Sequence, residues 1–224
     1  MDSVIALNSI SNVTVHHADS LTGVGRIIAP LLAGGSIAVS GGSTYAQLFK
    51  LWRDMKVSCT NASFYPVDER MVAFDDEQSN WGTAWRLFLA PMHKEEDKHH
   101  FAVDASEYAR LLKSNLGEPA PIFDLILLGV GDDGHTASLF PVGEYLDDME
   151  SIALQTLSPK PPPNRITIGP RVIAAAKKVI TLLFGSGKKE IFQRILAKDT
   201  ALPIVKVLGM RQDSLLYVER ALTE

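Results

Sequence analysis

Asp132, Asp133 and His135 lie close together in a glycine-rich stretch that directly follows an apolar run. An imidazole beside a carboxylate suits proton transfer near neutral pH, because histidine changes its charge in that range. The residues leave open which of the two aspartates contacts His135, and a solvated histidine in a surface turn is the alternative for this residue taken alone. We predict His135 and Asp133 as catalytic residues.

A second group of residues suits the binding of a phosphate group. Residues 41–44 (GGST) stand between an apolar run and a helical pattern, an order that presents free backbone N–H groups to an anion. A glycine-rich turn capped by a hydroxyl is the alternative for this loop. Charge-assisted contacts to an anion contribute roughly 1.5–3 kcal/mol each, so converging arginine and lysine side chains would dominate binding. The predicted binding residues are Gly42, Ser43, Thr44, Asp68, Arg70, Arg165 and Lys188.

These residues follow apolar runs that predict buried strands. The run 123–130 lacks polar alternation, which is typical of a strand covered on both faces in a parallel sheet. Polar clusters also follow the runs 36–40, 63–67 and 179–184. Because the carboxyl ends of parallel strands meet at one edge of a sheet, we expect all four clusters to share one crevice. The fold class predicted is α/β with a mostly parallel sheet, in a single domain over residues 1–224.

Helical spacing of apolar residues predicts helices from about residue 20, after the 41–44 loop, around 83–92, and over 104–116, 170–177 and from about 190. In the second of these, five residues are expected to share the inward face: Tyr45, Leu48, Phe49, Trp52 and Met55. Residues 158–165 (SPKPPPNR) are interpreted as a stiff connector that presents Arg165.

Composition limits the class of partner. The formal charge of −4, the pI near 5.9 and the lack of a basic block argue against nucleic acid and acidic lipid. Cys59 is the single cysteine, and no apolar run approaches the roughly 20 residues that span a bilayer. We therefore expect a cytoplasmic protein without membrane contact, and the sequence leaves a monomer or a small homo-oligomer open.

The sequence argues against two further site types, a dinucleotide site and a zinc site. The glycines at 129, 131 and 134 match GxGxxG, but the motif falls mid-chain and no helix and strand with a ribose-binding acid follow it, which argues against NAD. His93, His99 and His100 lie in a charged stretch without matching ligands elsewhere, so a solvated loop is favoured over a zinc site. No metal and no cofactor are predicted.

Several segments in order are similar to one known family. They are residues 40–44 (SGGST), 67–70 (VDER), 79–80 (SN), 131–141 (GDDGHTASLFP), 158–167 (SPKPPPNRIT) and 185–188 (GSGK). On these motifs, which are spread in order over most of the chain, the sequence resembles the 6-phosphogluconolactonases, within the superfamily that also holds glucosamine-6-phosphate deaminases. Departures at Ala73, Tyr45 and Phe184 concern loop shape and remove no charged site residue.

The resemblance implies a three-layer α/β/α fold with a Rossmann-like sheet and cofactor-free hydrolysis of a phosphosugar lactone, 6-phospho-D-glucono-1,5-lactone. It implies that His135 is the general base and that Asp133 orients it. It also implies that Arg70, Arg165 and Lys188, with the 42–44 loop, hold phosphate and sugar oxygens. Two alternatives stay open: an aminosugar-phosphate deaminase or isomerase, and a sugar-phosphate sensor without catalysis.

Overall fold

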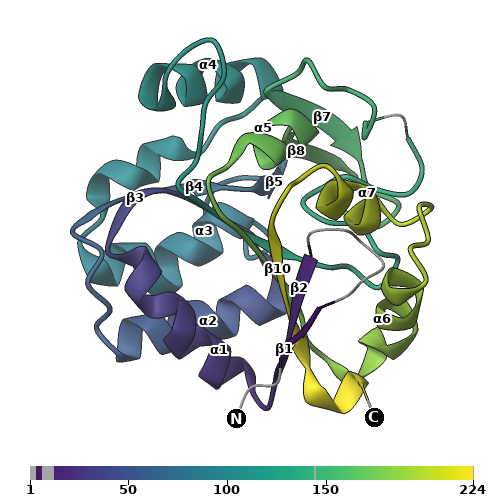
Figure 1. Ribbon diagram of the computed structural model, residues 1–224. Coiled ribbons are helices and arrows are strands. Elements are labelled where there is room, and N and C mark those ends of the chain that lie inside the picture. The colour runs from purple at the N-terminus through teal and green to yellow at the C-terminus, as the bar shows by residue number, and fades with distance from the viewer. Residues whose placement is uncertain (1–3, 7–12, 144, 224) are drawn as a thin grey trace.

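The computed structural model describes residues 4–6, 13–143 and 145–223, which form two β-sheets surrounded by helices (Figure 1). The strands are β1 Val4–Ala6, β2 Val13–Ala18, β3 Gly34–Val39, β4 Asn61–Pro66, β5 Asp68–Arg70, β6 Leu125–Gly129, β7 Ala153–Leu157, β8 Asn164–Ile168, β9 Val179–Leu183 and β10 Ser214–Glu219. The α-helices are α1 Leu21–Ile28, α2 Gly42–Asp54, α3 Asn80–Ala84, α4 Ala105–Leu116, α5 Pro170–Ala175, α6 Lys189–Leu196 and α7 Pro203–Gly209. Short helical turns complete the described chain: η1 Ala29–Leu32, η2 Trp85–Leu89, η3 Ala90–Met92, η4 Glu95–His100, η5 Ser186–Lys188 and η6 Arg220–Leu222.

The larger sheet has the strand order β1-β2-β10-β9-β6-β3-β4 within the described residues. Every neighbouring pair is parallel except β1 with β2. Three of the four apolar runs that precede polar clusters become the adjacent strands β9, β6 and β3, and the fourth becomes β4 beside β3. The prediction of a mostly parallel α/β fold is confirmed.

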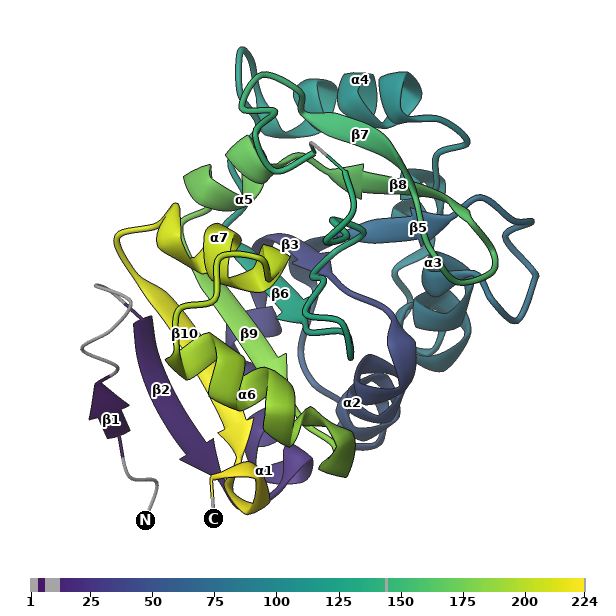
Figure 2. The ribbon, with the colours of Figure 1, turned by 90° about the vertical axis from the view of Figure 1, so that its right-hand side faces the viewer.

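Helices cover both faces of this sheet (Figure 2). Alternate residues of β6 point to opposite sides: Leu125 and Leu127 pack with α1 and α2, whereas Ile126 and Leu128 pack with α4 and α5. Helices α6 and α7 cover the remaining part of the second face, over β2 and β10. A strand buried on both faces needs no polar alternation, which explains the unbroken apolar run.

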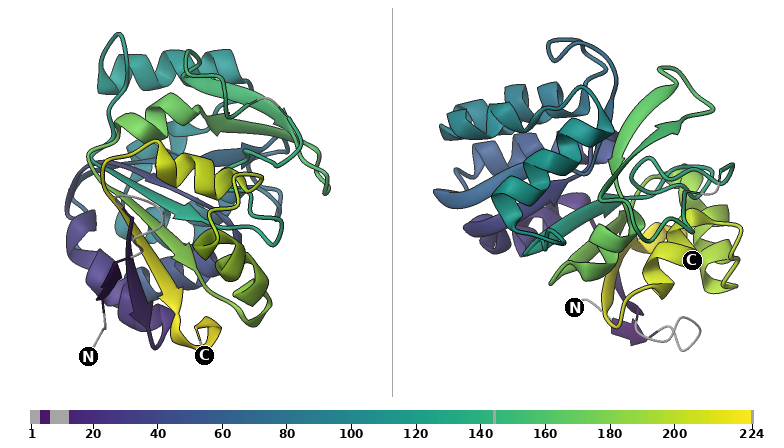
Figure 3. Two further views of the ribbon diagram at one scale, coloured as in Figure 1. Left: turned by 45° about the vertical axis from the view of Figure 1, so that its right-hand side comes forward. Right: turned by 90° about the horizontal axis from the view of Figure 1, so that it is seen from above.

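A second, three-stranded antiparallel sheet, in the order β5-β8-β7, was not predicted. Asp68–Arg70 forms strand β5, and residues 158–163 of the expected connector are the loop of the β7–β8 hairpin. Arg165 belongs to β8 and pairs in register with Arg70. The hairpin projects beside α4 (Figure 3). Because β5 pairs with β8, Arg70 and Arg165 lie together near the carboxyl end of the larger sheet.

The stretch around His100 is also different from the prediction. Lys94, Asp97 and His100 are buried rather than solvated, and Asp97 and His100 contact the edge strand β4. Asp97 Oδ2 accepts a hydrogen bond from Phe64 N at 3.1 Å, and His100 Nδ1 contacts the Phe64 carbonyl oxygen. These side chains satisfy backbone groups of β4 that an uncovered sheet edge would leave open.

The predicted helices begin within a few residues of the expected positions, but helix α7, Pro203–Gly209, was not predicted. Ser79 caps α3 by accepting from Gly82 N at 2.8 Å, and Asp104 caps α4. Met55, expected on the inward face of α2, is 41% exposed because the helix ends at Asp54. Within the described residues, every helix is too short or too polar to cross a bilayer.

Candidate active site

A cavity of about 570 Å³ opens at the carboxyl edge of the larger sheet. Its walls come from the ends of β3, β6 and β9, the start of α2, the strand β5 and the β7–β8 loop. The polar clusters predicted to share one crevice do share it. The cavity is lined by all nine predicted site residues: Gly42, Ser43, Thr44, Asp68, Arg70, Asp133, His135, Arg165 and Lys188.

His135 and Asp133 form a hydrogen-bonded pair in the turn after β6. Asp133 Oδ1 contacts His135 Nδ1 and also accepts from the backbone N of His135 at 3.2 Å. The turn is closed by Gly131 N, which donates to the His135 carbonyl at 2.8 Å. A Cβ on Gly131 would lie 2.1 Å from the imidazole, so the ring position requires glycine there. Of the two aspartates left open by the sequence, Asp133 is the partner of His135.

The electrostatics of the pair fix how His135 presents its nitrogens. Burial by itself raises the pKa of Asp133, but the hydrogen bond and charge of His135 outweigh that effect and lower the pKa to about 2. The carboxylate is therefore ionised at neutral pH and can only accept, which places a proton on His135 Nδ1. In the neutral form of the ring, Nε2 is then the nitrogen without a proton. The ring packs against Phe140 at 4.8 Å between centroids and lines the cavity.

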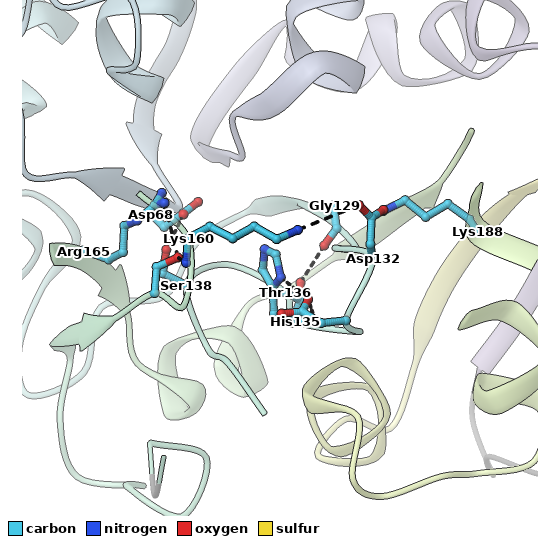
Figure 4. A network of polar contacts seen from close by, with 11 residues as sticks. Asp68, Gly129, Asp132, His135, Thr136, Ser138, Lys160, Arg165 and Lys188 are labelled. Atoms are coloured by element: carbon cyan, nitrogen blue, oxygen red, sulfur yellow. Dashed lines mark hydrogen bonds and ion pairs between the residues drawn. The ribbon is translucent and has the colours of Figure 1, made fainter. Parts of the chain in front are cut away.

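Asp68 is held by a hydroxyl that sequence reasoning missed. Ser138 Oγ donates to Asp68 Oδ2 at 2.6 Å, and both side chains are nearly inaccessible to solvent. Thr156 Oγ1 in turn donates to the Ser138 carbonyl at 2.8 Å. The contact joins the segment after His135 to the smaller sheet (Figure 4). Ser138 lies three residues beyond His135 in the motif 131–141, but the spacing alone gives no hint of its partner.

Glu69, between Asp68 and Arg70 in strand β5, binds backbone groups of the protein. Its two carboxylate oxygens accept from the backbone N atoms of Arg70, Asn80 and Trp81, at 2.6–2.8 Å, and from Ser79 Oγ at 2.9 Å. Burial raises the pKa of Glu69, and these hydrogen bonds oppose that shift. The carboxylate ties β5 to the start of α3, and it is not among the residues that line the cavity.

The GGST loop proves to be the first turn of α2. Gly42 has φ +85°, a conformation that suits glycine, and α2 begins there, so Ser43 and Thr44 belong to the helix. A Cβ on Gly41 would lie 2.1 Å from Asn80 Oδ1, so any residue larger than glycine at position 41 would clash with this side chain. The start of this 13-residue helix lines the cavity and no side chain caps it, and the N–H groups of a helix's first turn favour an anion.

Cations stand at two sides of the cavity. Arg165 is buried, with its Nε donating to the Pro162 carbonyl at 2.8 Å, and burial followed by the charge of Arg70 lowers its pKa. Arg70 donates to the Gln78 carbonyl at 3.1 Å. On the other side Lys188 pairs with Asp132. Lys160, from the β7–β8 loop, is a cavity-lining cation that sequence reasoning did not select.

A cluster of metal-ligating side chains is absent from the part of the chain that the structure describes. Among those residues, no group of three or more histidine, cysteine, aspartate or glutamate side chains could hold a metal ion.

Comparison with known proteins gives a consistent result. Residues 33–217 match the family model described as glucosamine-6-phosphate isomerases/6-phosphogluconolactonase. The 6-phosphogluconolactonase of Rattus norvegicus is 36% identical over 188 residues, covering 77% of this chain and 73% of the relative. A putative 6-phosphogluconolactonase of Caenorhabditis elegans is 33% identical, covering 82% of this chain and 74% of the relative.

Solved structures share the fold along nearly the whole chain. The 6-phosphogluconolactonase of Trypanosoma brucei has a TM-score of 0.78 at 26% identity, covering 95% of this chain and 97% of that one. A monomeric glucosamine-6-phosphate deaminase has a TM-score of 0.75 at 20% identity, covering 93% and 98%, which shows a shared fold alone. With the family model spanning most of the sequence, the chain belongs to the glucosamine-6-phosphate isomerase/6-phosphogluconolactonase family.

Proposed function

We propose that the protein is a carboxylic ester hydrolase that opens 6-phospho-D-glucono-1,5-lactone to 6-phospho-D-gluconate. The observation that carries the proposal is the Asp133–His135 pair at the wall of a cavity that also contains Arg70, Arg165 and Lys188. The pair supplies a base, and the cations suit a phosphorylated substrate. The sequence relatives named 6-phosphogluconolactonase support this assignment over other reactions of the family.

The mechanism begins at His135 Nε2. This nitrogen takes a proton from a water molecule as the water oxygen attacks C1 of the lactone, and the ionised Asp133 stabilises the imidazolium that forms. The bond between C1 and the ring oxygen then breaks, and the imidazolium gives its proton to that oxygen, which becomes a hydroxyl. The new acid loses a proton to solvent, and His135 returns to its starting state. No group besides water is consumed.

Positioning supplies the rest of the catalysis. A lactone is an activated ester, so holding its carbonyl carbon near the base removes much of the entropic part of the barrier. Arg70 and Arg165, paired across β5 and β8, provide positive charge near the oxygens of the substrate. Asp68, fixed by Ser138, is placed to accept from a sugar hydroxyl. The first turn of α2 and Lys188 add donors for phosphate oxygens.

Two other functions, an aminosugar-phosphate deaminase or isomerase and a sugar-phosphate sensor, would require different features of the site. An aminosugar-phosphate deaminase or isomerase would release ammonia or change the sugar of glucosamine 6-phosphate, and the similarity to a deaminase structure extends to the fold alone. A sensor needs cations but no base, whereas Asp133 holds His135 in one tautomer, a feature that a binding site does not require. The lactonase proposal places the reaction in the oxidative pentose phosphate pathway of the cytoplasm.

The substrate assignment is tested by comparing two substrates with one enzyme preparation. The lactone is generated in situ, spontaneous hydrolysis is subtracted, and release of 6-phosphogluconate is followed, while ammonia release from glucosamine 6-phosphate is measured in parallel. We expect acceleration of lactone opening and no ammonia. Ammonia release without lactone opening would replace the proposal by the deaminase, and binding of both compounds without turnover would replace it by the sensor.

A further inference from the structure

Three charged side chains meet at one end of the cavity and are not explained by the chemistry at His135. Asp132 Oδ1 contacts Lys188 Nζ, and Asp132 Oδ2 lies 4.0 Å from Lys160 Nζ. The two lysines come from different elements, η5 and the β7–β8 loop, and reach the carboxylate from opposite sides (Figure 4). One carboxylate thus lies between two ammonium groups at the cavity wall.

The exposure of the three side chains shows which of them can be exchanged. The side chain of Lys188 is 15% exposed and is therefore largely packed against the protein, whereas that of Asp132 is 69% exposed. The side chain of Lys160 is 68% exposed and reaches across the cavity from its loop. Ion pairs with an exposed partner are weak, so another anion can take the place of the Asp132 carboxylate at little cost.

A phosphate group is a stronger ligand for two ammonium groups than this carboxylate. It carries about two negative charges at neutral pH and three acceptor oxygens, whereas Asp132 carries one charge and has two oxygens. Lys188, through its hydrogen bond and charge, lowers the pKa of Asp132, so the carboxylate is ionised and competes at neutral pH. When phosphate arrives, the two anions repel, and the exposed Asp132 side chain can turn toward solvent.

We propose that Lys160 and Lys188 together bind the phosphate group of the substrate, and that Asp132 occupies both ammonium groups until the phosphate displaces it. This inference rests on the proposed function and adds to it a binding residue, Lys160, and a built-in competitor, Asp132. It leaves Arg70 and Arg165, on the other side of the cavity, for the sugar and carbonyl oxygens. The β7–β8 loop then contacts the substrate through both Lys160 and Arg165.

The test is titration calorimetry with inorganic phosphate at pH 7.5 and constant ionic strength. Asp132→Asn is expected to lower the dissociation constant about two- to fivefold, because the competing charge is gone. Lys160→Ala is expected to raise it by a similar factor. Two exposed ion pairs outside the cavity provide matched controls: Asp54→Asn removes the same charge beside Arg53, and Lys177→Ala removes a lysine paired with Asp124. Both controls should bind phosphate as the wild type does.

Three results would overturn the inference: unchanged or weaker phosphate binding by Asp132→Asn, unchanged binding by Lys160→Ala, or equal shifts in the controls. The rate of lactone opening by the wild type is measured separately. A wild type that opens the lactone while Asp132→Asn fails to tighten binding refutes the displacement and leaves the lactonase proposal standing. A wild type without lactonase activity whose variants shift as expected refutes the lactonase and leaves the two-lysine anion site standing.

Discussion

Replacing Asp133 by asparagine isolates the contribution of one charge to catalysis. The amide oxygen that the substitution introduces can still accept from His135 Nδ1, so the tautomer is kept while the negative charge beside the ring is lost. Hydrogen bonds to a charged group contribute about 1.5–3 kcal/mol and neutral ones about 0.5–1.5 kcal/mol. The difference, about 1–1.5 kcal/mol, falls on the transition state, in which the imidazolium forms. We therefore expect kcat to fall about tenfold with little change in KM.

The assay is the initial rate of lactone opening over a range of substrate concentrations, with spontaneous hydrolysis subtracted. Asp54→Asn serves as the control, because it removes the same charge from an exposed position outside the cavity. Thermal unfolding of each variant shows whether the fold is kept. A kcat within a factor of two of the wild type, or a loss confined to KM, would refute the argument that Asp133 stabilises a positive charge on His135.

Three further changes probe two supports of the site and the covered edge of the larger sheet. Ser138→Ala removes the hydroxyl that donates to the buried Asp68. We therefore expect the free energy of unfolding to fall by about 1–3 kcal/mol and the KM for the lactone to rise. An unchanged KM would show that Asp68 does not touch the substrate. Gly41→Ala should raise KM, since the new methyl group, just before α2, displaces Asn80 of α3 at the cavity wall; unchanged kinetics would contradict this. Burial raises the pKa of Asp97 to about 6 from its usual 3.8, so the folded protein binds a proton more firmly than the unfolded chain and loses stability as pH rises from about 4 to about 6. Asp97→Asn should therefore be more stable than the wild type at pH 7.5, by up to about 3 kcal/mol, and about equal to it at pH 4, as measured by denaturant unfolding; equal stability at both values would contradict the argument.

The strands and the cavity edge could be predicted because their signals are local. An apolar run without alternation identifies β6, and parallel strands necessarily bring their carboxyl ends to one edge. The positions of His135 and Lys188 in one cavity follow from that rule. The glycine requirement at residue 131 is also local, because the backbone turns within a few residues of the imidazole.

The smaller sheet and its contacts could not be predicted because their signals are not local. Strand β5 has three residues, too few for a period to appear, and its pairing with β8 joins positions almost a hundred residues apart. The hydrogen bond from Ser138 to Asp68 joins residues that are 70 positions apart in sequence. His100 was judged by its charged neighbours, whereas its burial depends on the edge strand β4, against which it packs.

The central claim is that His135 acts as the general base in lactone opening. The most direct measurement is kcat for the wild type, His135→Ala and His99→Ala, with the lactone generated in situ and spontaneous hydrolysis subtracted. His99 is an exposed histidine outside the cavity and is the matched control. General acid–base catalysis contributes about 10²–10⁴ in rate, so His135→Ala should lose at least about a hundredfold in kcat while His99→Ala keeps the wild-type value. A His135→Ala variant with wild-type kcat would contradict the account.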